Sequence, residues 1–152
     1  MTNLERLSEL GITLPEAPAP AASYQPYSIT GNLILTAGQI ATDRGTFVAQ
    51  GIVGDTIDLE TAQACARQCA INILAQVNGA IGTVENIRIV KLNVFVASTP
   101  GFTDQHLVAN AASNFMAEVL GEQGKHARSA VGVASLPLNS PVEIEAIVEF
   151  QK

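Results

Sequence analysis

The chain has 152 residues, a length that fits one domain and leaves little room for a second. Apolar residues make up 47% of it and charged residues 14%, which supplies material for a packed core and excludes a globally disordered chain. Eight Lys and Arg against fourteen Asp and Glu give a formal charge of −6, the wrong sign for gripping a nucleic-acid backbone or an anionic membrane. With charge this sparse, we expect some apolar surface to be buried against copies of the same chain.

The N-terminal residues are polar, and no stretch approaches the ~20 apolar residues of a membrane span, so the sequence predicts a soluble, cytoplasmic protein. Cys65 and Cys69 lie four apart in a helical pattern and project from different turns, which disfavours a disulfide and favours small core residues. His106 and His126 have no ligand spacing to the cysteines, so no metal is expected.

The first half of the chain opens with leucines spaced by three, which predict a short helix over residues 2–10. A stretch rich in proline and alanine follows, and we expect it to run extended. The predicted organisation is an N-terminal helix and arm, residues 1–23, packed on one α+β domain, residues 24–152. Two apolar runs separated by a Thr-Gly-Asn turn predict a β-hairpin over residues 24–38.

A turn at residues 43–46 and a loop at residues 51–55 lead to a predicted helix that begins at Thr56 or Asp58 and ends near Val77. Its apolar residues recur at intervals of three and four residues, as on one face of a helix. We expect Gly79 and Gly82 to end it.

The second half alternates strands and helices. Residues 87–97 predict a strand, 103–120 a helix, and 128–136 and 142–150 two further strands, with the chain reversing at 137–141. The order β-β-(β)-α-β-α-β-β predicts an α+β fold in which two helices cover one face of a mixed sheet.

The face of the sheet away from the helices is expected to carry polar side chains in one part and small residues in another. In the last strand the apolar residues alternate with glutamates, which places the glutamates on that face. We expect Arg128 to lie beside them, together with Ala130, Gly132 and Ala134. Such a face is typical of a subunit interface or a ligand site.

Motif searches find no glycine-rich phosphate loop, metal signature or nucleophile elbow. Arg128 opens a strand and could clamp a carboxylate with its two-pronged guanidinium, although from its position alone a surface salt bridge is the simpler interpretation. Glu143 would be a solvated residue unless a buried setting made it a proton carrier. The Gly38-Gln39 pair could be a plain turn.

An ordered set of segments carries a family resemblance across residues 24–150. These segments are Gly31-Asn32-Leu33-Ile34-Leu35-Thr36-Ala37-Gly38-Gln39, Val90-Lys91-Leu92-Asn93-Val94-Phe95-Val96, Ala127-Arg128-Ser129-Ala130-Val131, Leu136-Pro137 and Val142-Glu143-Ile144-Glu145-Ala146. Together they resemble the Rid (YjgF/YER057c/UK114) family. The opening Leu10-Gly11-Ile12 with Leu14-Pro15, and residues 121–133, are similar to a longer branch of it.

The resemblance implies a YjgF-like, chorismate-mutase-like α+β fold and a homotrimer with sites between subunits. It also implies a cofactor-free deaminase that hydrolyses 2-imino acids and their 2-enamine tautomers to 2-keto acids and ammonia. The implied partners are a small carboxylate or imino acid and further copies of the chain. A non-catalytic carboxylate-binding or regulatory protein is the alternative. A ribonuclease role, attached to some relatives, fits poorly with the acidic composition.

The family's functional residues carry over by position. Arg128 matches the arginine that holds the substrate carboxylate, and Glu143 matches the glutamate that positions water. The matching pocket positions are Tyr24, Ala37, Gly38, Asn110 and Ala130. Ala37 and Ala130 replace a usual serine and a frequent cysteine, so we expect low activity on small imines and a preference for a bulkier apolar side chain.

The strand pattern adds a geometric expectation. The last two strands are expected to run in opposite directions from a short loop, so Arg128 should lie near the Glu149 end of the last strand and about six residues from the level of Glu143. At ~3.3 Å per residue this is on the order of 20 Å, too far for one small pocket. The two residues are therefore expected to serve one site only if they come from different chains.

Overall fold

The computed structural model describes residues 1–17 and 23–152. The predicted extended course at Pro18 and Pro20 lies outside the described residues. Within the described part, no helix is both long enough and apolar enough to cross a membrane.

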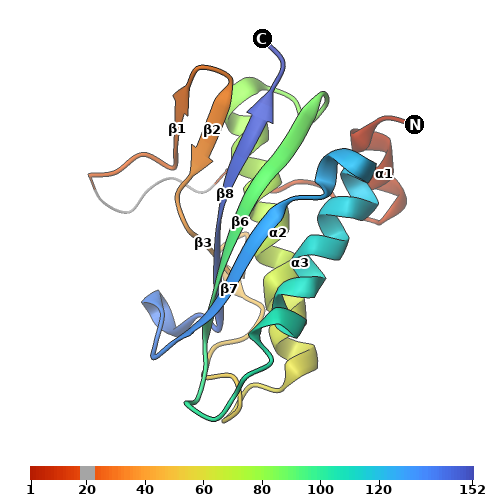
Figure 1. The fold of residues 1–152 in the computed structure, drawn as a ribbon. Coiled ribbons are helices and arrows are strands. Elements are labelled where there is room, and N and C mark those ends of the chain that lie inside the picture. Colours follow the sequence, from red (N-terminus) through yellow and green to blue (C-terminus); the bar gives the residue numbers. More distant parts are fainter. Residues whose placement is uncertain (18–22) are drawn as a thin grey trace.

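A mixed sheet forms one layer of the protein (Figure 1). Its strands lie in the order β1 (Tyr27–Thr30), β2 (Leu33–Thr36), β8 (Val142–Phe150), β6 (Ile87–Ala97) and β7 (Ala127–Val133), and β3 (Gln39–Ile40) also pairs with β8. Strands β6 and β7 are parallel, whereas the other pairs are antiparallel. A separate small hairpin consists of β4 (Thr42–Asp43) and β5 (Thr46–Phe47).

The helices form the second layer and cover one face of the sheet (Figure 1). This layer consists of α2 (Leu59–Ile81) and α3 (Gln105–Leu120). The other helical segments are α1 (Asn3–Glu9) and the short 3-10 turns η1 (Gly121–Gly124) and η2 (Pro137–Asn139). The predicted α+β class, with α2 and α3 on one face of a mixed sheet, is confirmed. Helix α1 begins at a capping box, in which Thr2 and Glu5 bond to each other's backbone, and it packs against α3.

The core lies between the two layers. Alternation in β8 sends Val142, Ile144 and Val148 toward the helices, where each is fully buried. Cys65 and Cys69 of α2 are buried and free, which confirms their interpretation as core residues. Burial raises the pKa of Cys65 to about 11, so its thiol stays protonated near neutral pH.

Helix α2 is longer than predicted. It runs to Ile81 with Gly79 inside it, and it ends at Gly82, whose φ of 75° gives the left-handed cap that glycine favours. The prediction that Gly79 ends the helix is wrong, because packing against the sheet and α3 outweighs the propensity cost of one glycine.

Strand order differs from the expected adjacency of the last two strands. Strand β6 pairs with both β7 and β8 and therefore lies between them. Strand β7 ends at Val133, earlier than predicted, and residues 134–141 carry the chain past the end of β6 to β8. This connection includes η2, where Leu138 and Asn139 have positive φ values.

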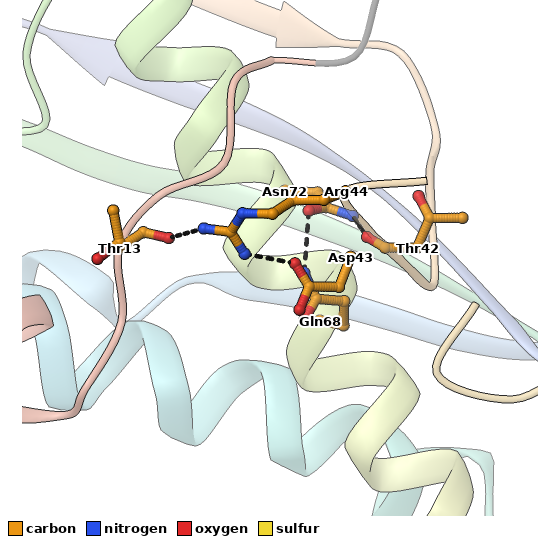
Figure 2. Close-up of polar contacts among 6 residues, drawn as sticks. All are labelled: Thr13, Thr42, Asp43, Arg44, Gln68 and Asn72. Carbon is orange, nitrogen blue, oxygen red and sulfur yellow. Dashed lines mark hydrogen bonds and ion pairs between the residues drawn. The ribbon is translucent and has the colours of Figure 1, made fainter. Parts of the chain in front are cut away.

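A polar cluster on α2 fixes the chain that follows β3 (Figure 2). The buried Asn72 side chain donates through Nδ2 to the carbonyl oxygens of Ile40 and Thr42 at 3.1 and 2.8 Å, and its Oδ1 accepts from Gln68. Arg44 of the adjacent hairpin donates to the Thr13 carbonyl at 2.9 Å. Helix α2 thereby holds the segment that begins just after Gly38.

Candidate functional site

Arg128 lies on the helix side of the edge strand β7. Its Nη1 donates to Asn110 Oδ1 at 2.9 Å and to Ser113 Oγ at 3.1 Å, and its Nη2 donates to the His106 carbonyl at 3.4 Å. All three acceptors are neutral and belong to α3. Among residues 1–17 and 23–152 Arg128 has no ion-pair partner, so the interpretation as a surface salt bridge is wrong.

Arg128 is therefore not on the face where the sequence analysis placed it. It is in register with Leu92, a core residue of β6 that points toward the helices. Gly132 shares that side, since a Cβ there would meet Gln105 Nε2 at 2.7 Å. The expectation of a glutamate-rich face that also carries Arg128, Ala130 and Gly132 is wrong. Strand β7 pairs with β6, and in this pairing these three residues face the helices, whereas the glutamates of β8 face the other side.

Asn110 and Arg128, two residues that the resemblance assigned to one pocket, are in direct contact. Asn110 lies four residues after His106 and three before Ser113, so all three share the α3 face that borders β7. Ala130, two residues beyond Arg128 on β7, is partly buried against the core. These residues form one group, which we call the β7 edge group: Asn110, Ser113, His126, Arg128 and Ala130.

Glu143 and Gly38 form a second group on the opposite face of the sheet. Glu143 alternates with the fully buried Val142 and Ile144, so its side chain points away from the helices. Its carboxylate lies so close to Gly38 that a Cβ on Gly38 would stand 2.7 Å from Glu143 Cδ and closer still to Oε1. Only glycine leaves room for the carboxylate in this position.

The electrostatics of Glu143 suit a proton carrier. Burial raises the pKa of Glu143, and the negative charge of Glu145 raises it further. Glu145 accepts a hydrogen bond from Asn93 Nδ2 at 3.1 Å, which keeps it beside Glu143 on the same face. A carboxylate whose pKa is shifted toward neutrality is a better general base than an ordinary surface glutamate.

The remaining predicted positions lie near the second group or apart from both. Ala37 follows β2 directly, is partly buried and donates its backbone N–H to the Pro26 carbonyl at 2.9 Å. Tyr24 precedes β1 and is 52% exposed. Strand β1 forms one edge of the sheet and β7 the other, so one chain holds Tyr24 and Arg128 at opposite edges.

Register gives the separation of Arg128 and Glu143 within one chain. Arg128 is level with Leu92 and Glu143 with Phe95, a difference of three residues along β6. At ~3.3 Å per residue and ~4.8 Å per strand this is about 10 Å along the strands and about 10 Å across them. The expected offset of six residues is wrong, because it assumed that β7 and β8 are neighbours.

Opposite faces separate the two residues more effectively than distance does. The guanidinium of Arg128 lies against α3. The carboxylate of Glu143 points to the other side of the sheet, over Gly38. One chain therefore does not bring the predicted carboxylate holder and the predicted water-positioning group together.

Two residues at this site escaped the sequence analysis. Ser113 Oγ bridges Arg128 Nη1, at 3.1 Å, and His126 Nε2, at 2.9 Å, while His126 Nδ1 lies 2.7 Å from the Gly124 carbonyl oxygen. By its sequence position alone, His126 is a candidate only for a metal ligand. The useful signal was its position two residues before Arg128, which puts both side chains on one side of a strand.

The described residues contain no group of three or more His, Cys, Asp and Glu side chains placed to hold a metal ion. A hollow of about 910 Å³ lies at the far end of the sheet, where its lining includes Gly31, Arg88 and Glu149. Arg88 and Glu149 form an exposed ion pair at 3.1 Å there. This hollow contains none of the predicted site residues.

Replacing Gly38 with alanine tests the contact with Glu143. We expect Gly38→Ala to push the flexible end of the Glu143 side chain aside while costing little stability, since the backbone there is free of positive φ. Any activity that depends on Glu143 should fall at least about tenfold. Turnover and urea denaturation measure the two effects, and Gly31→Ala, at an open position with positive φ, is expected to show the reverse pattern.

Comparison with known proteins assigns the class. The family model described as Endoribonuclease L-PSP matches residues 14–150. The chain belongs to this family, which confirms the resemblance to YjgF proteins.

Individual relatives extend the match. The structure of protein Atu1372 from Agrobacterium tumefaciens shares 52% sequence identity, with a TM-score of 0.92 over 98% of this chain and 92% of that one. The YjgF structure from E. coli shares 31% identity, with a TM-score of 0.64 over 90% and 94% of the two chains. A protein from Dermatophagoides farinae named 2-iminobutanoate/2-iminopropanoate deaminase is 30% identical over 92% of this chain and 95% of its own length.

Proposed function

We propose that this protein is a cofactor-free deaminase that hydrolyses 2-imino acids and their 2-enamine tautomers to 2-keto acids and ammonia. The observation that carries the proposal is Arg128, an arginine held by neutral acceptors and left without an anionic partner in the described structure. Both Nη1 hydrogens and one Nη2 hydrogen donate to α3, so within the described residues the Nε–H and the second Nη2 hydrogen remain as a pair of donors for a ligand carboxylate. The deaminase name of a relative that is 30% identical supports the reaction class.

The reaction needs only a few groups. A protonated imine carbon is electrophilic, so the enzyme has to hold the substrate carboxylate and present one water molecule. Arg128 holds the carboxylate. Glu143 removes a proton from water while the water oxygen bonds to the imine carbon. It then gives this proton to the imine nitrogen. As the C–N bond breaks and ammonia leaves, the remaining hydroxyl proton passes to Glu143 and from there to the ammonia, which departs as ammonium, and the carbon keeps the water oxygen as the 2-keto group.

We further propose that the site forms between subunits of a homotrimer. In one chain, Arg128 and Glu143 face opposite sides of the sheet, so a neighbouring chain has to supply one of them. The face that carries Glu143 also exposes apolar surface, since Leu35 is 38% and Val131 46% exposed and both face away from α2 and α3. Association through this face would bury that surface.

Hydrolysis of freshly generated 2-iminopropanoate tests the reaction. We expect the protein to release ammonia and pyruvate faster than buffer does, with a bulkier imine hydrolysed faster than a small one. Ala37 and Ala130, where the family resemblance implies a serine and a cysteine, favour the alternative of a carboxylate-binding protein. Pyruvate binding without turnover of any imine would establish that alternative and refute the deaminase.

Mixed trimers test the shared site. Arg128→Ala and Glu143→Gln chains are each expected to keep about 1% of wild-type activity or less, because every site in either trimer lacks one group. Mixing the two after denaturation and refolding should restore about a quarter of wild-type activity, since a complete site needs the intact arginine of one chain and the intact glutamate of the next. If one chain supplied both groups, mixing would restore nothing. Sedimentation of the mixture verifies that trimers form.

A cytoplasmic location is part of the proposal. The two buried, free cysteines fit a reducing compartment. The formal charge of −6 argues against the ribonuclease activity in the family model's description, because a polyanionic substrate would be repelled. Incubation with single-stranded RNA is expected to leave the RNA intact.

A further inference from the structure

A chain of hydrogen bonds connects the proposed carboxylate site to His126, a titratable imidazole. Arg128 Nη1 donates to Ser113 Oγ at 3.1 Å, and Ser113 Oγ lies 2.9 Å from His126 Nε2. His126 Nδ1 lies 2.7 Å from the carbonyl oxygen of Gly124 at the end of η1. The Ser113 hydroxyl and the His126 ring thus join three separate elements, α3, β7 and η1.

The partners fix the direction of each hydrogen bond. A carbonyl oxygen only accepts, so His126 Nδ1 carries a proton and donates to Gly124. In the neutral imidazole Nε2 is then an acceptor, and the Ser113 hydroxyl donates to it. This leaves the lone pairs of Ser113 Oγ for Arg128, which can only donate. Ser113 therefore holds the guanidinium in place while its own hydroxyl is held by His126.

Protonation of His126 would keep the bridge and add a charge. Nε2 would become a donor, and the two lone pairs of Ser113 Oγ could accept from His126 and Arg128 together. The imidazolium and the guanidinium would then be separated by a single oxygen atom. Two cations this close repel each other unless an anion lies beside them.

The surroundings single out Arg128 as the charge that His126 senses. Burial lowers the pKa of His126, the hydrogen bond to Gly124 raises it, and the positive charge of Arg128 lowers it. The other charged groups on the adjoining elements are directed elsewhere. On η1 and its end, Glu122 and Lys125 pair with each other at 2.6 Å; on α3, Glu118 and His106 are exposed; on β6, Lys91 is in register with Ala127.

We propose that His126 is a positioning residue of the Arg128 site, coupled to it through Ser113, and that a carboxylate binding at Arg128 draws a proton onto His126. This inference rests on the proposed carboxylate site. A bound carboxylate neutralises the guanidinium and so removes the repulsion that opposes the imidazolium. The pKa of His126 is then higher in the complex than in the free protein, and affinity for carboxylates rises as pH falls through that range.

Two measurements with pyruvate test the coupling. In NMR titrations of the imidazole groups, saturating pyruvate should raise the pKa of His126 by about one unit, a shift that corresponds to about tenfold tighter binding at low pH than at high pH. Calorimetry between about pH 5 and pH 8 should show that tenfold change directly, since the pyruvate carboxyl stays ionised throughout. His126→Gln should bind pyruvate with an affinity that no longer depends on pH.

The second histidine provides a matched control. His106 is exposed and lies on the same face of α3, where only its backbone carbonyl contacts Arg128. His106→Gln should keep the pH dependence. Ser113→Ala should weaken pyruvate binding and reduce the pKa shift of His126, and Ser113→Thr, which keeps the hydroxyl, should restore both.

The outcomes separate this inference from the proposed function. Pyruvate binding with an unmoved His126 pKa would overturn the coupling and leave the carboxylate site standing. Loss of the pH dependence in His106→Gln would show that His106, and not His126, causes the effect, and would overturn the coupling. A protein that binds no 2-keto acid at any pH would refute the site at Arg128 and the coupling together.

Discussion

Removing the Arg128 guanidinium is expected to weaken the binding of 2-keto acids by about 100-fold. Hydrogen bonds between charged partners contribute about 1.5–3 kcal/mol each, and a loss of about 3 kcal/mol corresponds to this factor. Within the described residues the hydrogen-bond acceptors of Arg128 are all neutral, so alanine leaves no countercharge unpaired there, and the loss should appear in ligand binding. Calorimetry with pyruvate measures the affinity of Arg128→Ala.

Two further variants make the result specific. Arg128→Lys keeps the positive charge but loses the planar fork, so its affinity should lie between those of the wild type and Arg128→Ala. Arg88→Ala removes another arginine of the sheet, one that is paired with Glu149 on the surface, and should change affinity by less than about twofold. Equal affinities in Arg128→Ala and the wild type would show that the ligand binds elsewhere.

Much of the fold follows from local patterns in the sequence. In β8 every second residue from Val142 to Val148 is buried, and the glutamates between them face away from the helices, as the alternation predicts. The strand at Ile87–Ala97 and the end of α3 at Leu120 also match the prediction. In each case the residues that decide the structure are neighbours in the sequence.

Sheet order was not predictable in the same way. The short connection at residues 134–141 favours a hairpin between β7 and β8, yet both strands pair with β6. Which strands become neighbours depends on the stability of each complete strand pair. Strand β6 is long and apolar and can pair along both of its edges. The wrong neighbour put Arg128 on the wrong face and doubled its expected offset from Glu143.

The contacts of the candidate site were hardest to predict. Asn110 was assigned by resemblance alone, and its hydrogen bond to Arg128 depends on how α3 packs beside β7. Ser113 is an ordinary polar residue of a helix until tertiary packing places it between Arg128 and His126. Gly38 resembles a plain turn glycine until the Glu143 carboxylate is placed over it.

Replacement of Glu143 by glutamine is expected to reduce imine turnover by about 100-fold or more while changing pyruvate affinity only slightly. A positioned general base typically contributes about 10²–10⁴ to the rate. Glutamine keeps the size of the side chain over Gly38 but cannot take a proton from water. The loss should therefore appear in kcat with little change in the binding of the product carboxylate.

The pH dependence identifies the role of Glu143 more directly than the rate does. The base acts when ionised, so activity should rise with pH through the pKa of Glu143, which burial and the charge of Glu145 place above its ordinary value. Glu145→Gln removes the second cause, lowers that pKa and should move the acidic limb of the profile to lower pH. Glu149→Gln, on the same strand and face but paired with Arg88, should leave the profile in place. An acidic limb that stays fixed in Glu145→Gln would mean that another group carries the proton, because Glu143 cannot lose a neighbouring charge without a change in its own titration.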